Sequence, residues 1–110
     1  MLKLVQRLHA KTQAGELQWE KTATANVFQA AFPSYVVRLS VQTGVGGGTD
    51  YYVSIRDDAG NLIEQASDVT INSVMRGSKV FELMSELYSM ARRKAMGVDK
   101  ALDSLLTELE

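Results

Sequence analysis

The chain has 110 residues, of which 45% are hydrophobic and 23% are charged. This is the composition of one globular domain over residues 1–110, because a disordered chain carries fewer apolar residues and two domains need a longer chain. The formal net charge of −1 excludes a strong overall field for nucleic acid or an anionic membrane. The absence of cysteine excludes disulfides, thiol nucleophiles and thiolate metal sites.

The first residues carry apolar side chains at helical spacing, at Leu2, Leu4, Val5 and Leu8. The pattern predicts an amphipathic helix over residues 2–14 that closes at Gly15. Polar residues interrupt it, so it is not the unbroken apolar segment of a signal peptide. No window holds the roughly 18 consecutive apolar residues of a membrane-spanning helix. We expect a cytoplasmic protein without a membrane partner.

Alternation of apolar and polar residues begins after this helix. Residues 16–21 alternate in a way that predicts a strand whose buried face is anchored by Trp19, the only tryptophan. Residues 28–32 and 35–41 alternate as well and are separated by Pro33, which favours a tight turn. These two segments are predicted to form a hairpin.

The glycine-rich segment 44–49 interrupts the alternation and is expected to be a mobile hairpin loop. It is not a phosphate-binding loop, because a strand over 51–56 follows it and it contains no lysine. Turn residues at 57–61 lead into a short strand at 62–64, which predicts a second hairpin. For residues 67–77 the pattern allows either a short strand or an irregular segment.

Two amphipathic helices are predicted at the end of the chain, over residues 78–95 and 99–109. Gly97 lies between them where a left-handed helix cap is expected, and Asp99 is placed to cap the second helix. The whole order predicts an α+β fold: an N-terminal helix, an antiparallel sheet of about four strands in two hairpins, and two C-terminal helices packed on one sheet face.

No catalytic or metal-binding pattern emerges from the sequence. His9 is the only histidine, and it has no second ligand three or four residues away. The spacing of Asp50, Asp57 and Asp58 does not match a calcium-binding loop, and no serine lies in a nucleophile elbow. The prediction is a protein that is not an enzyme and has no cofactor and no metal.

The last predicted helix carries a stripe of leucines at helical spacing: Leu102, Leu105, Leu106 and Leu109. Such a stripe has to be covered, either by the chain's own sheet or by a second copy or another protein. We prefer association, and predict a non-catalytic homodimer or small regulatory or accessory subunit with these leucines as the interface.

Two alternatives remain open from the sequence. The basic run Arg92, Arg93 and Lys94, helped by Arg76 and Lys79, is a candidate nucleic-acid patch, although cations also suit the end of a helix. A stacking platform on the strands is the related possibility; its members are Trp19, Tyr35, Tyr52, Arg38 and Arg56. The second alternative is a small-molecule binder, whose pocket would be lined by Met75, Met84, Met90 and Met96.

Two motifs carry a resemblance to known sequences. Thr12 to Trp19 reads T-x-x-G-x-L-x-W, and Ala91 to Leu102 reads A-R-R-x-A-x-G-V-x-x-A-L. Together they resemble the pattern of a group of small bacterial proteins and span most of the chain. The resemblance implies a free-standing cytoplasmic domain of bacterial type, and it brings no activity, cofactor or site residue.

Overall fold

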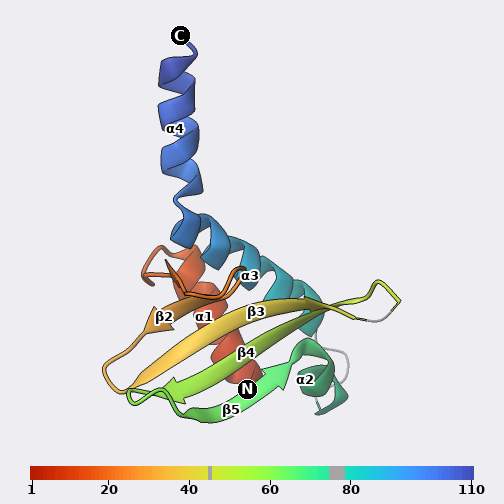
Figure 1. The fold of residues 1–110 in the computed structure, drawn as a ribbon. Helices are drawn as coiled ribbons and strands as arrows, with labels where there is room; N and C mark the ends of the chain where they lie inside the picture. Colours follow the sequence, from red (N-terminus) through yellow and green to blue (C-terminus); the bar gives the residue numbers. More distant parts are fainter. Residues whose placement is uncertain (45, 75–78) are drawn as a thin grey trace.

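The computed structural model describes the chain except for residues 45 and 75–78 (Figure 1). Helices and strands follow in the order α1 (Leu2–Gln13), β1 (Glu20–Lys21), β2 (Phe28–Ala31), β3 (Tyr35–Thr43), β4 (Thr49–Asp57), β5 (Leu62–Ser67), α2 (Asp68–Val74), α3 (Val80–Met96) and α4 (Val98–Glu108). The expected α+β class is confirmed, with five strands in the described residues rather than about four.

The five strands form one antiparallel sheet in chain order, β1 to β5. Its centre is the pair β3 and β4, which runs in unbroken register from Tyr35 opposite Asp57 to Thr43 opposite Thr49. The glycine-rich segment therefore joins two antiparallel strands, as predicted, and both predicted hairpins are confirmed.

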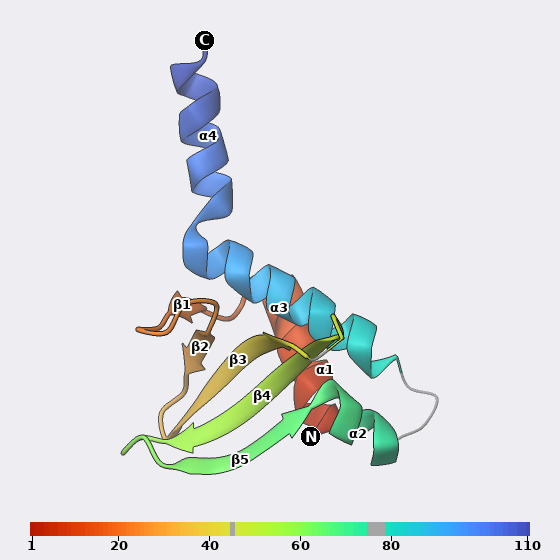
Figure 2. The same cartoon turned by 45° about the vertical axis from the view of Figure 1, so that its right-hand side comes forward.

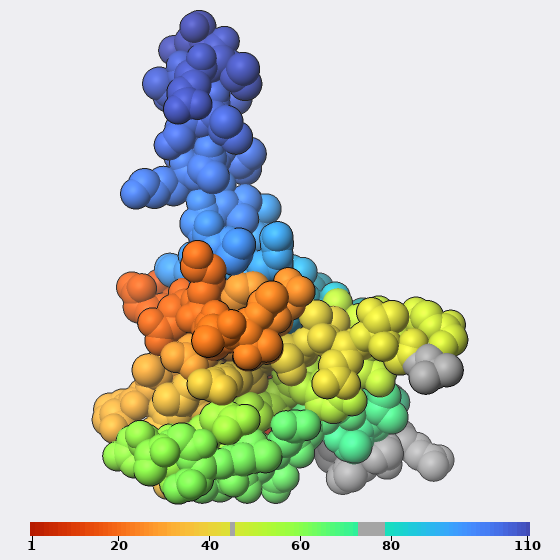
Figure 3. All heavy atoms as spheres, in the orientation of Figure 1, coloured from red at the N-terminus to blue at the C-terminus, as the bar shows by residue number. Residues whose placement is uncertain are grey.

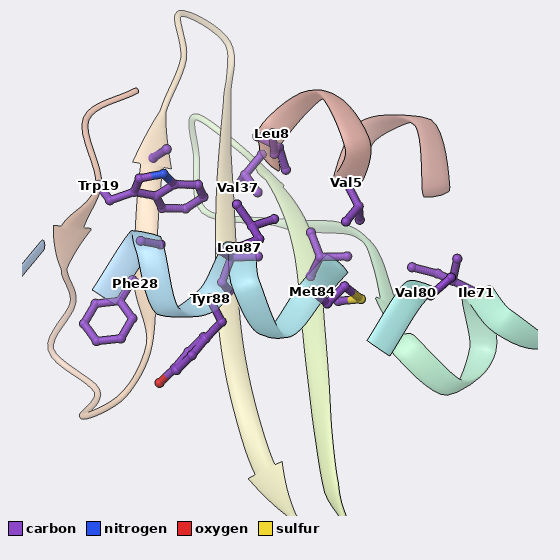
Figure 4. Close-up of a cluster of buried hydrophobic side chains, with 14 residues drawn as sticks. Val5, Leu8, Trp19, Phe28, Val37, Ile71, Val80, Met84, Leu87 and Tyr88 are labelled. Atoms are coloured by element: carbon purple, nitrogen blue, oxygen red, sulfur yellow. The ribbon is translucent and has the colours of Figure 1, made fainter. Parts of the chain in front are cut away.

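Helices α1 and α3 lie on one face of the sheet and enclose the core (Figures 1 and 2). Figure 4 shows side chains from both helices meeting those of the strands, with Val5 of α1 and Leu87 of α3 fully buried. The predicted stripe of α3 is confirmed, because its buried members are Val80, Met84, Leu87, Tyr88 and Ala91. The predicted start of this helix at Ser78 lies outside the described residues.

The predicted strand over 16–21 is wrong for most of its length, because only Glu20–Lys21 pairs in the sheet. Gly15 takes a left-handed conformation with φ of 75° after α1 and turns the chain back. Trp19 is only 4% exposed, as predicted for a core anchor, and its indole Nε1 donates a hydrogen bond to Oγ1 of Thr12 at 2.9 Å. The alternation thus reflects packing against α1 rather than strand pairing.

Neither structure expected for residues 67–77 is right, because α2 begins at Asp68. Reciprocal hydrogen bonds start this helix: Ser67 N donates to Thr70 Oγ1 at 2.9 Å, and Thr70 N donates to Ser67 Oγ at 3.1 Å. This is the geometry of a capping box, which satisfies amide groups that have no partner inside the helix. The rest of the predicted segment, residues 75–77, lies outside the described residues.

The two C-terminal helices differ in how they pack. Helix α3 covers the sheet, whereas α4 leaves the end of α3 and extends away from the body (Figures 1 and 2). Gly97 joins them in the predicted left-handed conformation, with φ of 64° and ψ of 39°. Asp99 does not cap α4; it lies in the first turn, and Gly97 holds the cap position without a side-chain hydrogen bond.

Candidate association surface

The leucine stripe of α4 lies on a helix that buries none of its residues. Leu102 is 49% exposed, Leu105 52%, Leu106 63% and Leu109 80%. The space-filling view shows this helix as a stalk beyond the rest of the molecule (Figure 3). Of the two covers that the sequence left open, the chain's own sheet is therefore not the one used in this structure.

Length and packing leave α4 with little to stabilise it within its own chain. It has 11 residues, and isolated helices shorter than about 12–15 residues are marginal in water. In proteins, helices of this length owe most of their stability to burial of an apolar face. The apolar face of α4 is its leucine stripe, so covering the stripe is the way to stabilise the helix.

Charge is distributed unevenly along this end of the chain. Residues 99–110 hold four acidic residues and one lysine, a net charge of −3, whereas Arg92, Arg93 and Lys94 add +3 at the end of α3. All three cations are exposed. We call residues 99–110 the shaft of the stalk and residues 92–94 its base. The shaft is therefore acidic, and the base is positively charged.

One ion pair crosses the joint between the helices. Nη2 of Arg93 lies 2.7 Å from Oδ1 of Asp99, and both side chains are more than half exposed. Exposed pairs of this kind contribute about 0.2–1 kcal/mol. The pair engages one of the three cations of the candidate nucleic-acid patch, and Arg76 of that patch lies outside the described residues.

The side chains of the predicted stacking platform do not lie on one common surface. Trp19 is buried in the core, and Tyr35, which is half exposed, lies on the other face of β3 from Arg38. The register of β3 and β4 places Arg38, Tyr52 and Arg56 on one common face, away from the helices. The Nε of Arg38 donates to Gln29 at 3.0 Å, which ties this side chain to the neighbouring strand.

Met84 and Met96, two members of the predicted methionine pocket, have different surroundings and do not line one common hollow. Met84 is 2% exposed in the core, whereas Met96 is 47% exposed and lines a hollow of about 260 Å³ with Arg92 and Lys21. Met75 lies outside the described residues. A larger hollow of about 460 Å³ lies between α1, β5 and α2 and is lined by residues that include Leu2, Ala66 and Ile71.

His9 and Asp57, which the sequence offered as candidate functional groups, make structural contacts. Nε2 of His9 lies 2.8 Å from Oε2 of Glu86 and links α1 to α3. The carboxylate of Asp57 accepts hydrogen bonds from the side chain and backbone of Asn61, and these lower its pKa. This is the hairpin turn predicted for residues 57–61.

The described part of the chain contains no group of three or more histidine or acidic side chains arranged to hold a metal ion. None of its helices has the length and apolar character needed to cross a membrane.

Sequence reasoning missed the partners of His9 and Asp99. The first pair joins residues 77 positions apart, and only the packing of α1 on α3 brings them together. The second pair is six residues apart, a spacing that does not make neighbours on one straight helix. The turn at Gly97 creates it, and Gly97 was the one signal of that turn in the sequence.

No family model, no curated protein and no solved structure matches this chain. The resemblance of the Thr12 to Trp19 and Ala91 to Leu102 motifs therefore stays a prediction.

Proposed function

We propose that this chain is a non-catalytic protein-association domain, and that its leucine stripe is the contact surface through which it forms a homodimer. The observation that carries the proposal is the exposure of four leucines, from 49% to 80%, on a helix that the rest of the chain does not cover. A stripe of this kind on a short, unsupported helix is the feature that helix-to-helix association uses.

Solution mass tests this proposal directly. Light scattering behind size exclusion, run over a range of protein concentrations, is expected to give a mass of two chains for the wild type. The double variant Leu105→Glu with Leu109→Glu puts two charges into the contact and is expected to give the mass of one chain. A wild type that stays monomeric, or an assembly that survives this variant, would exclude the stripe as the contact surface.

A matched control lies on the opposite face of the same helix. Ser104 and Thr107 point away from the stripe by the 3.6-residue period, and both are exposed. The variant Ser104→Glu with Thr107→Glu adds the same two charges to α4 and is expected to keep the wild-type mass. Fluorescence of Trp19, which is buried far along the chain from α4, reports whether the body of each variant is folded.

A further inference from the structure

We infer that the stripe is covered by α4 of a second copy lying antiparallel to the first, so that the acidic end of each helix reaches the basic base of the other stalk. This inference rests on the proposed function and adds to it the orientation and register of the two copies. Its first support is charge, and its second is the fit of the apolar side chains.

The charge pattern distinguishes the two possible orientations. The two −3 shafts lie side by side in either orientation, whereas only a parallel pair also places each +3 base beside the other base. Like charges side by side oppose such a pair. An antiparallel pair brings Glu108 and Glu110 of one copy level with the joint at Gly97 of the other, within about one helical turn of Lys94, the nearest of the three cations Arg92, Arg93 and Lys94.

The joint at Gly97 holds the cation Arg93 where the antiparallel pair brings the acidic end of the partner α4. Arg93 is held over the first turn of α4 by its 2.7 Å contact with Asp99. The end of a partner α4 would arrive beside that turn, where the guanidinium has further N–H donors for a second carboxylate. Arg92 and Lys94 form no ion pair within the described part of the chain, so they add free positive charge at the same end.

The apolar side chains match in the same register. Leu102, Leu105 and Leu109 follow three- and four-residue steps, and Val98 continues the series toward Gly97. In an antiparallel pair, Leu102 of each copy meets Leu105 of the other, and Leu109 meets Val98. Leu109, the most exposed of the leucines, thereby gains a half-buried neighbour at the base of the partner's stalk.

Cross-linking tests the orientation, because the chain contains no cysteine of its own. Two single variants, Val98→Cys and Leu109→Cys, are prepared with tags of different mass, mixed in equal amounts and mildly oxidised. Disulfides require the two Cα atoms to lie within about 7 Å. The antiparallel pair is expected to give mainly the mixed covalent dimer, with each variant alone giving little product.

The matched control pair is Ser104→Cys and Thr107→Cys, on the far side of α4, which is expected to show no preference for the mixed product. For each variant, light scattering under reducing conditions first establishes the mass of a dimer, and fluorescence of Trp19 establishes that this side chain is still buried. A product dominated by the Leu109→Cys chain linked to itself would mean a parallel pair and overturn the inference.

Different outcomes exclude the proposed function and the proposed orientation. If Leu105→Glu with Leu109→Glu abolishes the dimer while cross-linking shows a parallel pair, the stripe is the contact surface and only the orientation is wrong. If the wild type has the mass of one chain, both the function and the orientation are excluded. A dimer of wild-type mass that gives no covalent product from any mixture overturns the pairing of the two helices.

Discussion

Trp19 depends on one buried hydrogen bond, and this makes Thr12 a residue whose loss can be measured. Thr12→Val keeps the shape of the side chain but removes the oxygen that accepts the indole N–H at 2.9 Å. A buried donor left without a partner costs about 1–3 kcal/mol, so the free energy of unfolding should fall by that amount. Urea denaturation followed by Trp19 fluorescence measures it.

Thr12→Ser serves as the control for this prediction, because it retains the accepting oxygen and loses only a methyl group. It should therefore keep more of the stability than Thr12→Val does. A larger loss in Thr12→Ser than in Thr12→Val would show that packing of the methyl group contributes more to stability than the hydrogen bond does. The burial of Trp19 was predictable from its place in an apolar alternation, but its partner was not, because the turn at Gly15 brings them together.

Gly97 sets the direction in which α4 leaves the body, and its conformation is the reason. A left-handed conformation costs an ordinary L-residue about 1–2 kcal/mol, whereas a right-handed one there continues α3 into α4. Gly97→Ala is therefore expected to straighten the joint and to break the contact between Arg93 and Asp99, which a straight helix cannot make.

Spin labels report this change at the level of the two helices. Labels attached through Ser89→Cys and Ser104→Cys, one on each helix, should move apart when Gly97→Ala is introduced into the monomeric Leu105→Glu, Leu109→Glu variant. The control is Gly97→Asn, since asparagine tolerates the left-handed region and should keep the wild-type distance. An unchanged distance in Gly97→Ala would show that the joint holds its angle without glycine.

Elements were predictable from the sequence where a period runs for several turns. Helices α1, α3 and α4 each repeat an apolar step over 11 residues or more. Wherever the predicted end of one of these helices lies in the described residues, it is within about two residues of the observed end. Helix α2 has only seven residues, and its cap pairs Ser67 with a threonine rather than a glutamate. Strand β1 has two residues, too few for any alternation to mark it.

At the scale of the whole molecule, the sequence predicted the class of fold but not where the last helix goes. A stripe of four leucines has the same spacing whether it packs on its own sheet or on another chain, so periodicity cannot distinguish the two. The structure places α4 apart from the sheet, and the molecule accordingly measures 52 Å in its longest direction against 35 and 27 Å.

The basic base and acidic shaft of the stalk lead to a prediction about assembly. Glu108→Lys with Glu110→Lys makes the end of α4 basic, so in an antiparallel pair it meets the partner's Arg92, Arg93 and Lys94 with like charge. Exposed pairs contribute about 0.2–1 kcal/mol each, and two symmetric contacts should raise the dimer Kd about tenfold at low salt. Sedimentation equilibrium measures the change, which molar salt should remove.

A control with the same change in net charge is Asp58→Lys with Glu64→Lys, at exposed positions near the turn between β4 and β5, and it should leave the Kd unchanged. A parallel pair predicts no such weakening for Glu108→Lys with Glu110→Lys, because these residues then lie beside the same residues of the partner and repulsion between glutamates is exchanged for repulsion between lysines. Loss of the helix itself does not explain a weaker dimer, since lysines at the C-terminal end of a helix favour its dipole and stabilise α4. A raised Kd therefore indicates the antiparallel orientation, and an unchanged Kd contradicts it.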